Sequence, residues 1–423
     1  MNALSPELSV IIPTLNEERN IALLLQRIKG PLKHAGLTYE IIVVDGNSVD
    51  CTVMLAKNNG ARVLLQKQRG FGNALRDGFE LARGKYVLTL DADFSHNPET
   101  IPEFIKARND ADIILGSRYI EGGKFVITLW RRLLSKFTNV VFSKVLHVPL
   151  GDLSGNFRLY RAEVIKNMQL DSVNYDVLQE IIVKAWSRGF SCKEIPIKYE
   201  YRSEGESKLK VRKFVATYAR TLFRLWKLRN SIKTADYDFL AYDSLIPLQM
   251  FWQRKRCRLL KEFAGSGKTV LDVGCGSSML LKQLPSLFGV DIKFSKIRFA
   301  KKFNKRCSCA SINSLPFKSN SFDVVICSQV IEHIPKTKDV FDELDRVLVN
   351  GGRLVLGTPD YDKITWCIIE KIYDFLLPDA YAQEHQSHYT FDSLKQLLTE
   401  RGYVIENYVY VFNSELIVVA KKP

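Results

Sequence analysis

The chain alternates strand-like and helix-like segments in two separate series, and this alternation constrains its fold more than any other feature. Strands that alternate with helices form mostly parallel sheets covered on both faces. The sequence therefore predicts two α/β domains. In the first series the strand patterns lie at 8–13, 40–45, 61–66 and 86–91, with helical spacing at 17–29 and 70–83. In the second they lie at 269–273, 287–291, 322–328 and 352–357, followed by a terminal pair at 404–411 and 415–420.

The boundary between the two series is predicted in the polar stretch 229–238, which has no strong apolar period. With 423 residues the chain is too long for one ordinary core. We therefore expect one domain at 1–232 and a second at 233–423, the latter opening with a helical region at 242–263. Two stretches of the first domain, 124–148 and 208–229, mix long apolar side chains with cations and are expected to form basic amphipathic helices.

The net charge of +15 favours anionic partners, which could be nucleic acid, membrane surfaces or phosphorylated substrates. The longest stretch without a charged residue, 307–317, is far shorter than the roughly 20 apolar residues of a membrane-spanning helix. Any membrane association is therefore expected to be peripheral. The eight cysteines form no CxxC pair, and no signal-peptide pattern follows Met1. These features predict reduced thiols and a cytoplasmic location.

Polar residues follow three strands of the first series. They are Pro13-Thr14-Leu15-Asn16-Glu17, Asp45-Gly46-Asn47-Ser48-Val49-Asp50 and Asp91-Ala92-Asp93. In open α/β sheets ligands bind beyond the carboxyl ends of the strands. Two carboxylates two residues apart can hold a hard divalent cation that also binds a diphosphate. The sequence therefore predicts a site for Mg²⁺ or Mn²⁺ at Asp91 and Asp93.

Further motifs follow in order: Gly116-Ser117-Arg118-Tyr119, Asp152-Leu153-Ser154-Gly155-Asn156-Phe157-Arg158 and Gly205-Glu206-Ser207-Lys208. Over roughly residues 7–225 the set resembles family 2 glycosyltransferases, and within them the dolichyl-phosphate mannose synthases. The resemblance implies a GT-A type fold, a GDP- or UDP-sugar donor and a dolichyl-type phosphate acceptor. Gly46 and Cys51 depart from the family pattern at positions that bear on recognition of the base.

The resemblance also implies roles for individual residues. The nucleotide-sugar pocket would be formed by Pro13, Leu15, Glu17, Val44, Asp45, Asp91, Ala92 and Asp93, and the metal ligands would be Asp91 and Asp93. Phosphates of donor and acceptor would be contacted by Arg118, Arg202 and Lys208, which with Asp93 form the implied catalytic set.

An acceptor phosphate is already anionic near neutral pH, so it needs positioning cations and no strong general base. In-line attack would invert the anomeric centre. If the acceptor were instead a growing glycan or polysaccharide, a general-base carboxylate would be needed, and Glu180 on the predicted helix 176–184 is the candidate. The basic amphipathic segments would bind an anionic membrane surface and receive the prenyl tail. Alternatively, they are core-facing helices with solvated basic faces.

In the second series, Val270-Leu271-Asp272-Val273-Gly274-Cys275-Gly276 is a strand that runs into a glycine-rich turn. Asp291 ends the next strand, and further motifs follow at 315–317, 321–325, 330–333 and 348–354. The succession resembles class I S-adenosylmethionine methyltransferases over roughly residues 240–423. The resemblance implies a Rossmann-like fold in which the cofactor contacts Asp272, Gly274, Gly276, Asp291 and Ser311.

The methyl acceptor is left open by the sequence, with His333, His385 and His388 as candidate bases for methylation of a hydroxyl. The favoured interpretation combines transfer of mannose from GDP-mannose, or of glucose from UDP-glucose, to polyprenyl phosphate with a methyltransferase. A different class of protein, a basic RNA-binding protein that methylates RNA, is also compatible with the charge. The cations cluster with long apolar residues and no RNA-binding module pattern occurs, so no nucleic-acid partner is expected.

Overall fold

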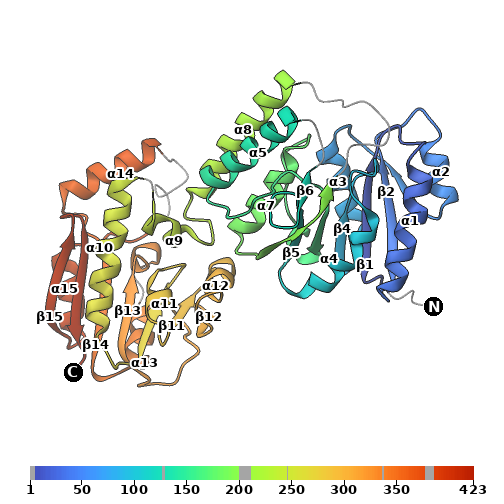
Figure 1. The fold of residues 1–423 in the computed structure, drawn as a ribbon. Helices are drawn as coiled ribbons and strands as arrows, with labels where there is room; N and C mark the ends of the chain where they lie inside the picture. Colours follow the sequence, from blue (N-terminus) through green and yellow to red (C-terminus); the bar gives the residue numbers. More distant parts are fainter. Residues whose placement is uncertain (1–4, 126–128, 200–210, 245, 336–337, 377–384) are drawn as a thin grey trace. The chain divides into compact units, whose positions relative to one another are not determined.

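The computed structural model describes residues 5–125, 129–199, 211–244, 246–335, 338–376 and 385–423 (Figure 1). The chain divides into two compact units, one of Met1–Trp186 with Phe190–Trp226 and one of Ser187–Gly189 with Lys227–Pro423. Each unit contains a seven-stranded sheet with helices packed on it. The predicted pair of α/β folds is confirmed.

The first unit begins with the predicted alternation of strands and helices and continues with elements that the sequence did not show. Its strands are β1 (Leu8–Thr14), β2 (Tyr39–Asp45), β3 (Arg62–Leu65), β4 (Tyr86–Thr89), β5 (Ile113–Ser117), β6 (Lys124–Phe125), β7 (Arg158–Arg161), β8 (Cys192–Pro196) and β9 (Lys198–Tyr199). Its helices are α1 (Ile21–His34), α2 (Thr52–Asn58), α3 (Phe71–Leu81), η1 (Pro98–Thr100), α4 (Ile101–Lys106), η2 (Ala107–Asn109), α5 (Leu129–Val145), α6 (Ala162–Ile165), α7 (Val177–Ser187) and α8 (Val211–Arg229).

The strands of this unit have the order β3-β2-β1-β4-β7-β5-β8. β1 pairs in parallel with β2 and with β4, so the chain leaves all three strands at the same edge of the sheet. The order reverses between β1 and β4, which makes this edge a topological switch point. β7 runs antiparallel between β4 and β5. It was not predicted, because a four-residue strand with arginine at both ends lacks the apolar run typical of a buried strand.

The core of the first unit forms where α1 and α4 cover the sheet. α1 buries Ile21, Leu24, Leu25 and Ile28, the residues whose spacing predicted the helix. They pack with the apolar side chains of β1, β2 and β4 in one buried cluster. This packing holds the three strand ends that carry the polar motifs.

The two predicted amphipathic segments form α5 and α8, which contact each other where the Phe142 ring lies 5.9 Å from that of Tyr218 (Figure 1). Both helices leave large apolar side chains exposed. On α5 these include Leu133 at 58% and Phe137 at 67%, and on α8 Phe223 at 58%. The exposed apolar residues show that packing within the unit covers only part of either apolar face.

The second unit has the strands β10 (Val270–Val273), β11 (Phe288–Asp291), β12 (Cys307–Cys309), β13 (Phe322–Ser328), β14 (Leu348–Pro359), β15 (Val404–Val411) and β16 (Glu415–Lys421). Its helices are α9 (Tyr237–Tyr242), α10 (Pro247–Ala264), α11 (Leu280–Gln283), α12 (Phe294–Ala300), η3 (Ile331–His333), α13 (Lys338–Val347), α14 (Ile364–Leu376) and α15 (Phe391–Glu400). The leading helical region is thus two helices.

The second sheet has the order β12-β11-β10-β13-β14-β16-β15 and is parallel except for β16, which runs antiparallel to both of its neighbours. The predicted terminal strand pair is therefore confirmed. The stretch 229–238 carries a buried ion pair, in which Arg229 Nη1 lies 2.6 Å from Asp236 Oδ1. No helix in the described part of the chain combines the length and the apolarity that crossing a bilayer requires.

Candidate functional site

A cleft of about 970 Å³ lies where β1, β2 and β4 end in the first unit. Seven of the predicted nucleotide-sugar residues line it: Pro13, Leu15, Glu17, Asp91, Ala92, Asp93 and Arg118. They come from three loops separated by some tens of residues, and the parallel pairing of the strands brings them to one edge. Clefts of this size, with apolar walls and a few convergent polar groups, are where ligands usually bind.

Asp91 and Asp93 follow β4 and present hard oxygen ligands to the cleft. The Asn156 side-chain amide donates to Asp91 Oδ1 at 3.0 Å, and the Ser95 backbone N–H donates to Asp93 Oδ1 at 3.1 Å. The side chain of Asp91 is 29% exposed, whereas Asp93 is buried. Two oriented carboxylates that line one cleft fit the preference of Mg²⁺ and Mn²⁺ for oxygen ligands.

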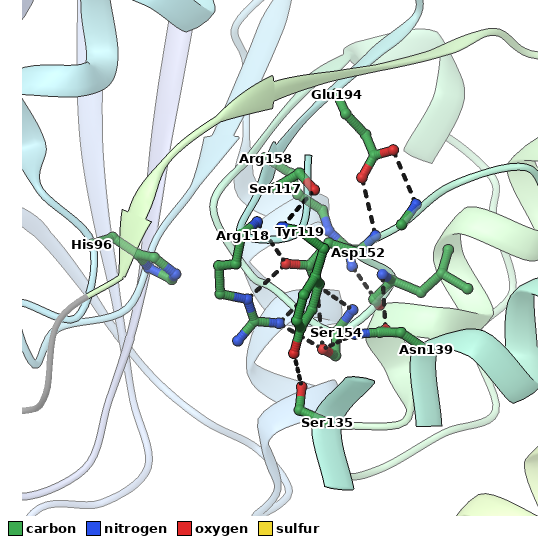
Figure 2. A network of polar contacts seen from close by, with 12 residues as sticks. His96, Ser117, Arg118, Tyr119, Ser135, Asn139, Asp152, Ser154, Arg158 and Glu194 are labelled. Carbon is green, nitrogen blue, oxygen red and sulfur yellow. Dashed lines mark hydrogen bonds and ion pairs between the residues drawn. The ribbon is translucent and has the colours of Figure 1, made fainter. Parts of the chain in front are cut away.

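Arg118 is held in the wall of the same cleft by a buried carboxylate (Figure 2). Its Nε donates to Asp152 Oδ2 at 2.6 Å and its Nη2 to Asp152 Oδ1 at 2.7 Å, a bidentate geometry. Nη2 also donates to Ser154 Oγ at 2.7 Å. Asp152 in turn is anchored through its backbone N–H, which donates to Glu194 at 3.0 Å. The guanidinium is therefore fixed in position before any phosphate arrives.

The charges of this pair reinforce each other. Burial alone would lower the pKa of Arg118, but the Asp152 carboxylate raises it above its ordinary value. Burial would raise the pKa of Asp152, and the charge and hydrogen bonds of Arg118 hold it below the ordinary value. Both groups are consequently ionised across the neutral range, and the wall of the cleft keeps a permanent cation.

His96 and Tyr199 complete the wall next to Asp91. The His96 ring is buried, with Nδ1 3.7 Å from Asp91 Oδ2, and it lies 5.5 Å from the ring of Tyr199. Burial lowers the pKa of His96 despite the nearby carboxylates, so this ring is neutral near pH 7. The Arg118 guanidinium lies 5.2 Å from the centre of the Tyr199 ring. Tyr199 was not predicted, because it is brought here by a bridge to His96 and by the pairing of β9 with β6, both between segments distant in the sequence.

The loops after β1 and β2 are joined by reciprocal hydrogen bonds. The Asn16 backbone N–H donates to Ser48 Oγ at 2.8 Å, while the Val49 N–H donates to Asn16 Oδ1 at 3.0 Å. Asn16 has a left-handed φ of 55°, which asparagine tolerates better than most residues. The two loops therefore form one rigid side of the cleft.

Val44 and Asp45, also predicted to contact the nucleotide, lie behind this side and are completely buried. Asp45 accepts hydrogen bonds from Thr14 Oγ1 at 3.0 Å and from Ser48 Oγ at 2.6 Å. In this structure Asp45 joins the two loops, and its contact with a base stays a prediction. The roles of Arg202 and Lys208 also stay predictions, because both residues lie outside the described residues.

Sequence reasoning missed a stacked aromatic pair at the other side of the cleft. Phe71 and Tyr175 both line it, with ring centres 4.5 Å apart and planes at 24°. Gly70, at φ 131°, precedes Phe71 and leaves no room for a side chain beside Val173. That glycine was the available signal, since an unusual backbone conformation before a helix indicates a close approach of two segments.

Glu180, the candidate base for a glycan acceptor, forms hydrogen bonds and ion pairs with neighbouring segments of the first unit. Its carboxylate accepts from the backbone N–H groups of Asp171 at 3.0 Å and Ser172 at 2.8 Å. It also forms ion pairs with Lys184 at 2.7 Å and Arg224 at 3.2 Å. Glu180 thus ties α7 to α8 and to the preceding loop, and it does not line the cleft.

The second unit has its own cleft, of about 600 Å³, lined among others by Gly274, Asp291, Ser311 and His333. Gly274 has φ +72°, and a Cβ there would lie 2.1 Å from Val330 Cγ2. At Gly276, φ +51°, a Cβ would lie 2.6 Å from Asp238 Oδ2. Only glycine fits either position, so the backbone of the turn can approach a ligand closely.

Carboxylates surround this turn. Asp291 Oδ2 accepts from the Gly276 N–H at 2.9 Å, and the buried Asp272 lines a smaller hollow that shares Gly274. Burial, with the charges of Asp238 and Asp291, raises the pKa of Asp272 to about 8. Asp238, which was not predicted, accepts from the Ser277 N–H at 3.1 Å. Nothing in the sequence indicates that contact, because α9 precedes the turn by nearly forty residues.

The three candidate histidines lie together near this second cleft. The ring of His385 lies 4.8 Å from that of His333, and His388 stacks on Tyr361 at 4.0 Å. Burial, aided by the two other histidines, lowers the pKa of His385 to about 4, and burial raises the pKa of the adjacent Glu332 to about 8. Their role as bases stays a prediction.

Comparison with known proteins gives a family for each unit. The glycosyl transferase family 2 model matches residues 9–168, and a methyltransferase domain model matches residues 271–356. A polyprenol monophosphomannose synthase from Mycolicibacterium smegmatis is 37% identical over 47% of this chain and 80% of that protein. A dolichol-phosphate mannosyltransferase from Pyrococcus furiosus is 36% identical over 53% of this chain, which spans 65% of that protein. A low-salt glycan biosynthesis hexosyltransferase from Haloferax volcanii is 32% identical over half of its length.

The chain therefore contains a glycosyltransferase unit followed by a methyltransferase domain. The chain belongs to glycosyl transferase family 2. Among solved structures, glucosyl-3-phosphoglycerate synthase from Mycobacterium tuberculosis matches 53% of this chain and 80% of its own, with TM-score 0.42 and 17% identity. A likeness at that level carries no argument about chemistry.

Proposed function

We propose that the first unit transfers a hexose, mannose from GDP-mannose or glucose from UDP-glucose, to a dolichyl or polyprenyl phosphate with inversion. The observation that carries this proposal is that Asp91, Asp93 and Arg118 line one cleft at the switch point of the sheet. The acceptor class is supported by the names of two relatives, a dolichol-phosphate mannosyltransferase and a polyprenol monophosphomannose synthase.

Each side chain has a defined task in this proposal. Asp91 and Asp93 would hold Mg²⁺ or Mn²⁺, which when bound neutralises charge on the departing nucleoside diphosphate. Arg118, fixed by Asp152, offers a planar fork that matches phosphate oxygens. Arg202 and Lys208 are proposed to supply further positive charge for the acceptor phosphate. His96 is neutral, so its ring can form hydrogen bonds in the cleft without placing a positive charge next to the metal ion.

The geometry argues against the other glycosyltransferase interpretation. Transfer to a sugar hydroxyl requires a general base close to the reacting atoms. The carboxylate considered for that task, Glu180, is buried and engaged by Lys184 and Arg224. An acceptor that is already anionic removes the need for such a base.

The direct test offers GDP-mannose and UDP-glucose, labelled in the sugar, with dolichyl phosphate and either Mg²⁺ or Mn²⁺. We expect labelled product in the organic phase, and its loss in excess chelator. Asp93→Asn should remove transfer, while Asp110→Asn, a change at an exposed carboxylate paired with Lys193, should not. Normal turnover by Asp93→Asn, or label only in water-soluble glycan, would refute the proposal.

We further propose that α5 and α8 bind the membrane surface that carries the acceptor. The exposed apolar residues of α5, Leu133 and Phe137 among them, lie with the exposed cations Arg132 and Lys136 on the same helix. Apolar side chains enter the lipid boundary, and each cation adds about 1 kcal/mol near anionic head groups. This arrangement favours peripheral binding over binding to RNA, for which exposed Leu and Phe give no advantage.

Sedimentation with vesicles of phosphatidylcholine and phosphatidylglycerol tests this second proposal. Leu133→Glu should reduce the bound fraction at least several-fold, because it places a charge on the apolar face. Leu23→Glu is the matched control, since Leu23 is 52% exposed on α1 and should leave binding unchanged. Equal sedimentation of both variants and the unaltered chain would contradict membrane binding through α5.

For the second unit we propose transfer of a methyl group from S-adenosylmethionine. The support is the glycine turn at Gly274 and Gly276, the carboxylate of Asp291 and the position of Ser311 in the same cleft. A bound cofactor supplies an activated methyl group, and the residues of the chain orient it toward the acceptor. Calorimetric titration with S-adenosylhomocysteine should show one binding site per chain, and no heat of binding would contradict this proposal.

A further inference from the structure

We propose that Glu332, His333 and His385 form a second metal site, which binds a divalent transition-metal ion in the methyltransferase unit. Each of the three residues offers one ligand atom, and these atoms all lie within 4.8 Å of one another. Two imidazoles and one carboxylate are a common ligand set for Zn²⁺ and related ions. The site differs in kind from the all-oxygen pair of Asp91 and Asp93.

The environment of Glu332 is the first independent observation. Its side chain is completely buried on η3, and neither carboxylate oxygen has a hydrogen-bond partner among the described residues. A buried carboxyl group without such partners is costly, and in proteins such a group ionises only where it is paired or coordinates a metal. Two imidazole rings lie next to these oxygens, which makes a shared cation the simplest compensation.

The orientation of His385 is the second observation. Its Nδ1 lies 2.6 Å from Tyr361 Oη and 3.6 Å from Glu370 Oε1, and its side chain is only 5% exposed. Metal-binding histidines usually use one ring nitrogen for the ion while the other is hydrogen-bonded, which fixes the ring and its tautomer. With Nδ1 at Tyr361, we assign Nε2 as the nitrogen that faces the ion.

The backbone holds the two ligand segments together although 53 positions separate Glu332 from His385. The N–H groups of Gln386 and Ser387 donate to the Glu332 carbonyl at 2.8 and 3.0 Å. The hydroxyl of Ser387 donates to the Ile334 carbonyl at 2.7 Å. The segment after His385 is therefore fixed to η3, and these backbone hydrogen bonds keep the ligand residues close to one another.

Only a small movement of the three side chains is needed to bring their ligand atoms to metal-binding distance. Metal–ligand bonds of about 2.1 Å place two ligand atoms of a tetrahedral ion about 3.4 Å apart. Closing the cluster from 4.8 Å thus requires side-chain movements of roughly 1 Å, which rotamer shifts can supply. His333 and Gln386 line the cleft of the methyltransferase unit, so one coordination position would face the space of the methyl acceptor. That placement rests on the proposed methyl transfer, whereas binding of the ion does not.

The test uses the whole chain carrying both Asp91→Asn and Asp93→Asn, because these substitutions remove the proposed oxygen site. This variant is titrated with Co²⁺ and Zn²⁺. We expect one equivalent of Co²⁺ with visible absorption of nitrogen and oxygen coordination, displaced by Zn²⁺. Near-ultraviolet bands of thiolate coordination would instead point to exposed cysteines such as Cys51 and Cys309 and would overturn the assignment. So would the absence of any bound equivalent.

Variants in the same background locate the ion. Glu332→Gln and His385→Ala should each weaken Zn²⁺ binding at least about 100-fold, and Tyr361→Phe about 10- to 100-fold through the orientation of His385. His388→Ala is the matched control, because His388 stacks on Tyr361 outside the cluster and should leave binding unchanged. If His385→Ala fails to fold, His333→Gln replaces it. Unaltered affinity in Glu332→Gln and His333→Gln would overturn the site, whatever the outcome of methyl-transfer assays.

Discussion

The ion pair between Arg118 and Asp152 gives the sharpest test of how the first site is built. Asp152 is 1% exposed and Arg118 is 9% exposed, and three hydrogen bonds join them at 2.6, 2.7 and 3.2 Å. Removal of one partner from a buried pair leaves the other charge buried, and this costs about 3–5 kcal/mol. Asp152→Ala should therefore lower the free energy of unfolding of the first unit by that amount.

For a unit of this size each kcal/mol corresponds to about 2–4 °C in Tm, so the expected shift is roughly 6–20 °C. Calorimetry of the full chain measures it, with the transition of the methyltransferase unit as an internal reference. The control is Asp110→Ala. Asp110 also pairs with a cation at 2.7 Å, but its side chain is 47% exposed and that of Lys193 50%. The control should cost about 0–1 kcal/mol.

The effect of pH on this variant has a definite sign. Because the folded state holds the pKa of Asp152 below its ordinary value, the stabilisation is present above an ordinary carboxyl pKa of about 3.9. It is lost as pH falls through the lower folded pKa. The difference between the unaltered chain and Asp152→Ala should therefore shrink in acid. A loss below 1 kcal/mol at pH 7, or one equal to that of Asp110→Ala, would refute the reasoning.

Three further predictions concern single residues. Gly274→Ala should abolish binding of S-adenosylhomocysteine and lower the Tm of the second unit, because the new Cβ would meet Val330 at 2.1 Å; titration and calorimetry measure both. Burial raises the pKa of Asp272 to about 8. The stabilisation that the protonated carboxyl gives the folded second unit is therefore complete below about pH 4 and is lost as pH rises through 8. Urea unfolding between pH 5 and 9 should show this decline, and a decline unchanged in Asp272→Asn would contradict it. Glu180→Gln should lower the Tm of the first unit, since the ion pair with Lys184 is lost, yet leave the pH profile of sugar transfer unaltered; loss of the alkaline or acidic limb would revive Glu180 as a base.

The sequence by itself was enough to predict the sites that are formed by a strand and the loop directly after it. Residues that end parallel strands must meet at one edge, so the order of strands and helices along the chain was enough to place Pro13, Asp91 and Asp93 in one site. The turn at Gly274 and Gly276 was equally visible, because its backbone conformation excludes side chains. In both cases the physical constraint acts within a strand and the loop that follows it.

Only the tertiary structure decided which side chains those residues meet across long separations. The antiparallel β7 and the pairing of β6 with β9 were hidden, since short strands carry too little apolar pattern to be recognised. Periodicity showed that α5 is amphipathic, but only packing shows that Leu133 and Phe137 remain uncovered. Whether a carboxylate is a base, a structural anchor or a metal ligand depends on its partners. For Glu180 and Glu332 those partners lie on segments that are distant in the sequence. Only folding of the chain brings these segments together, and no local sequence pattern indicates it.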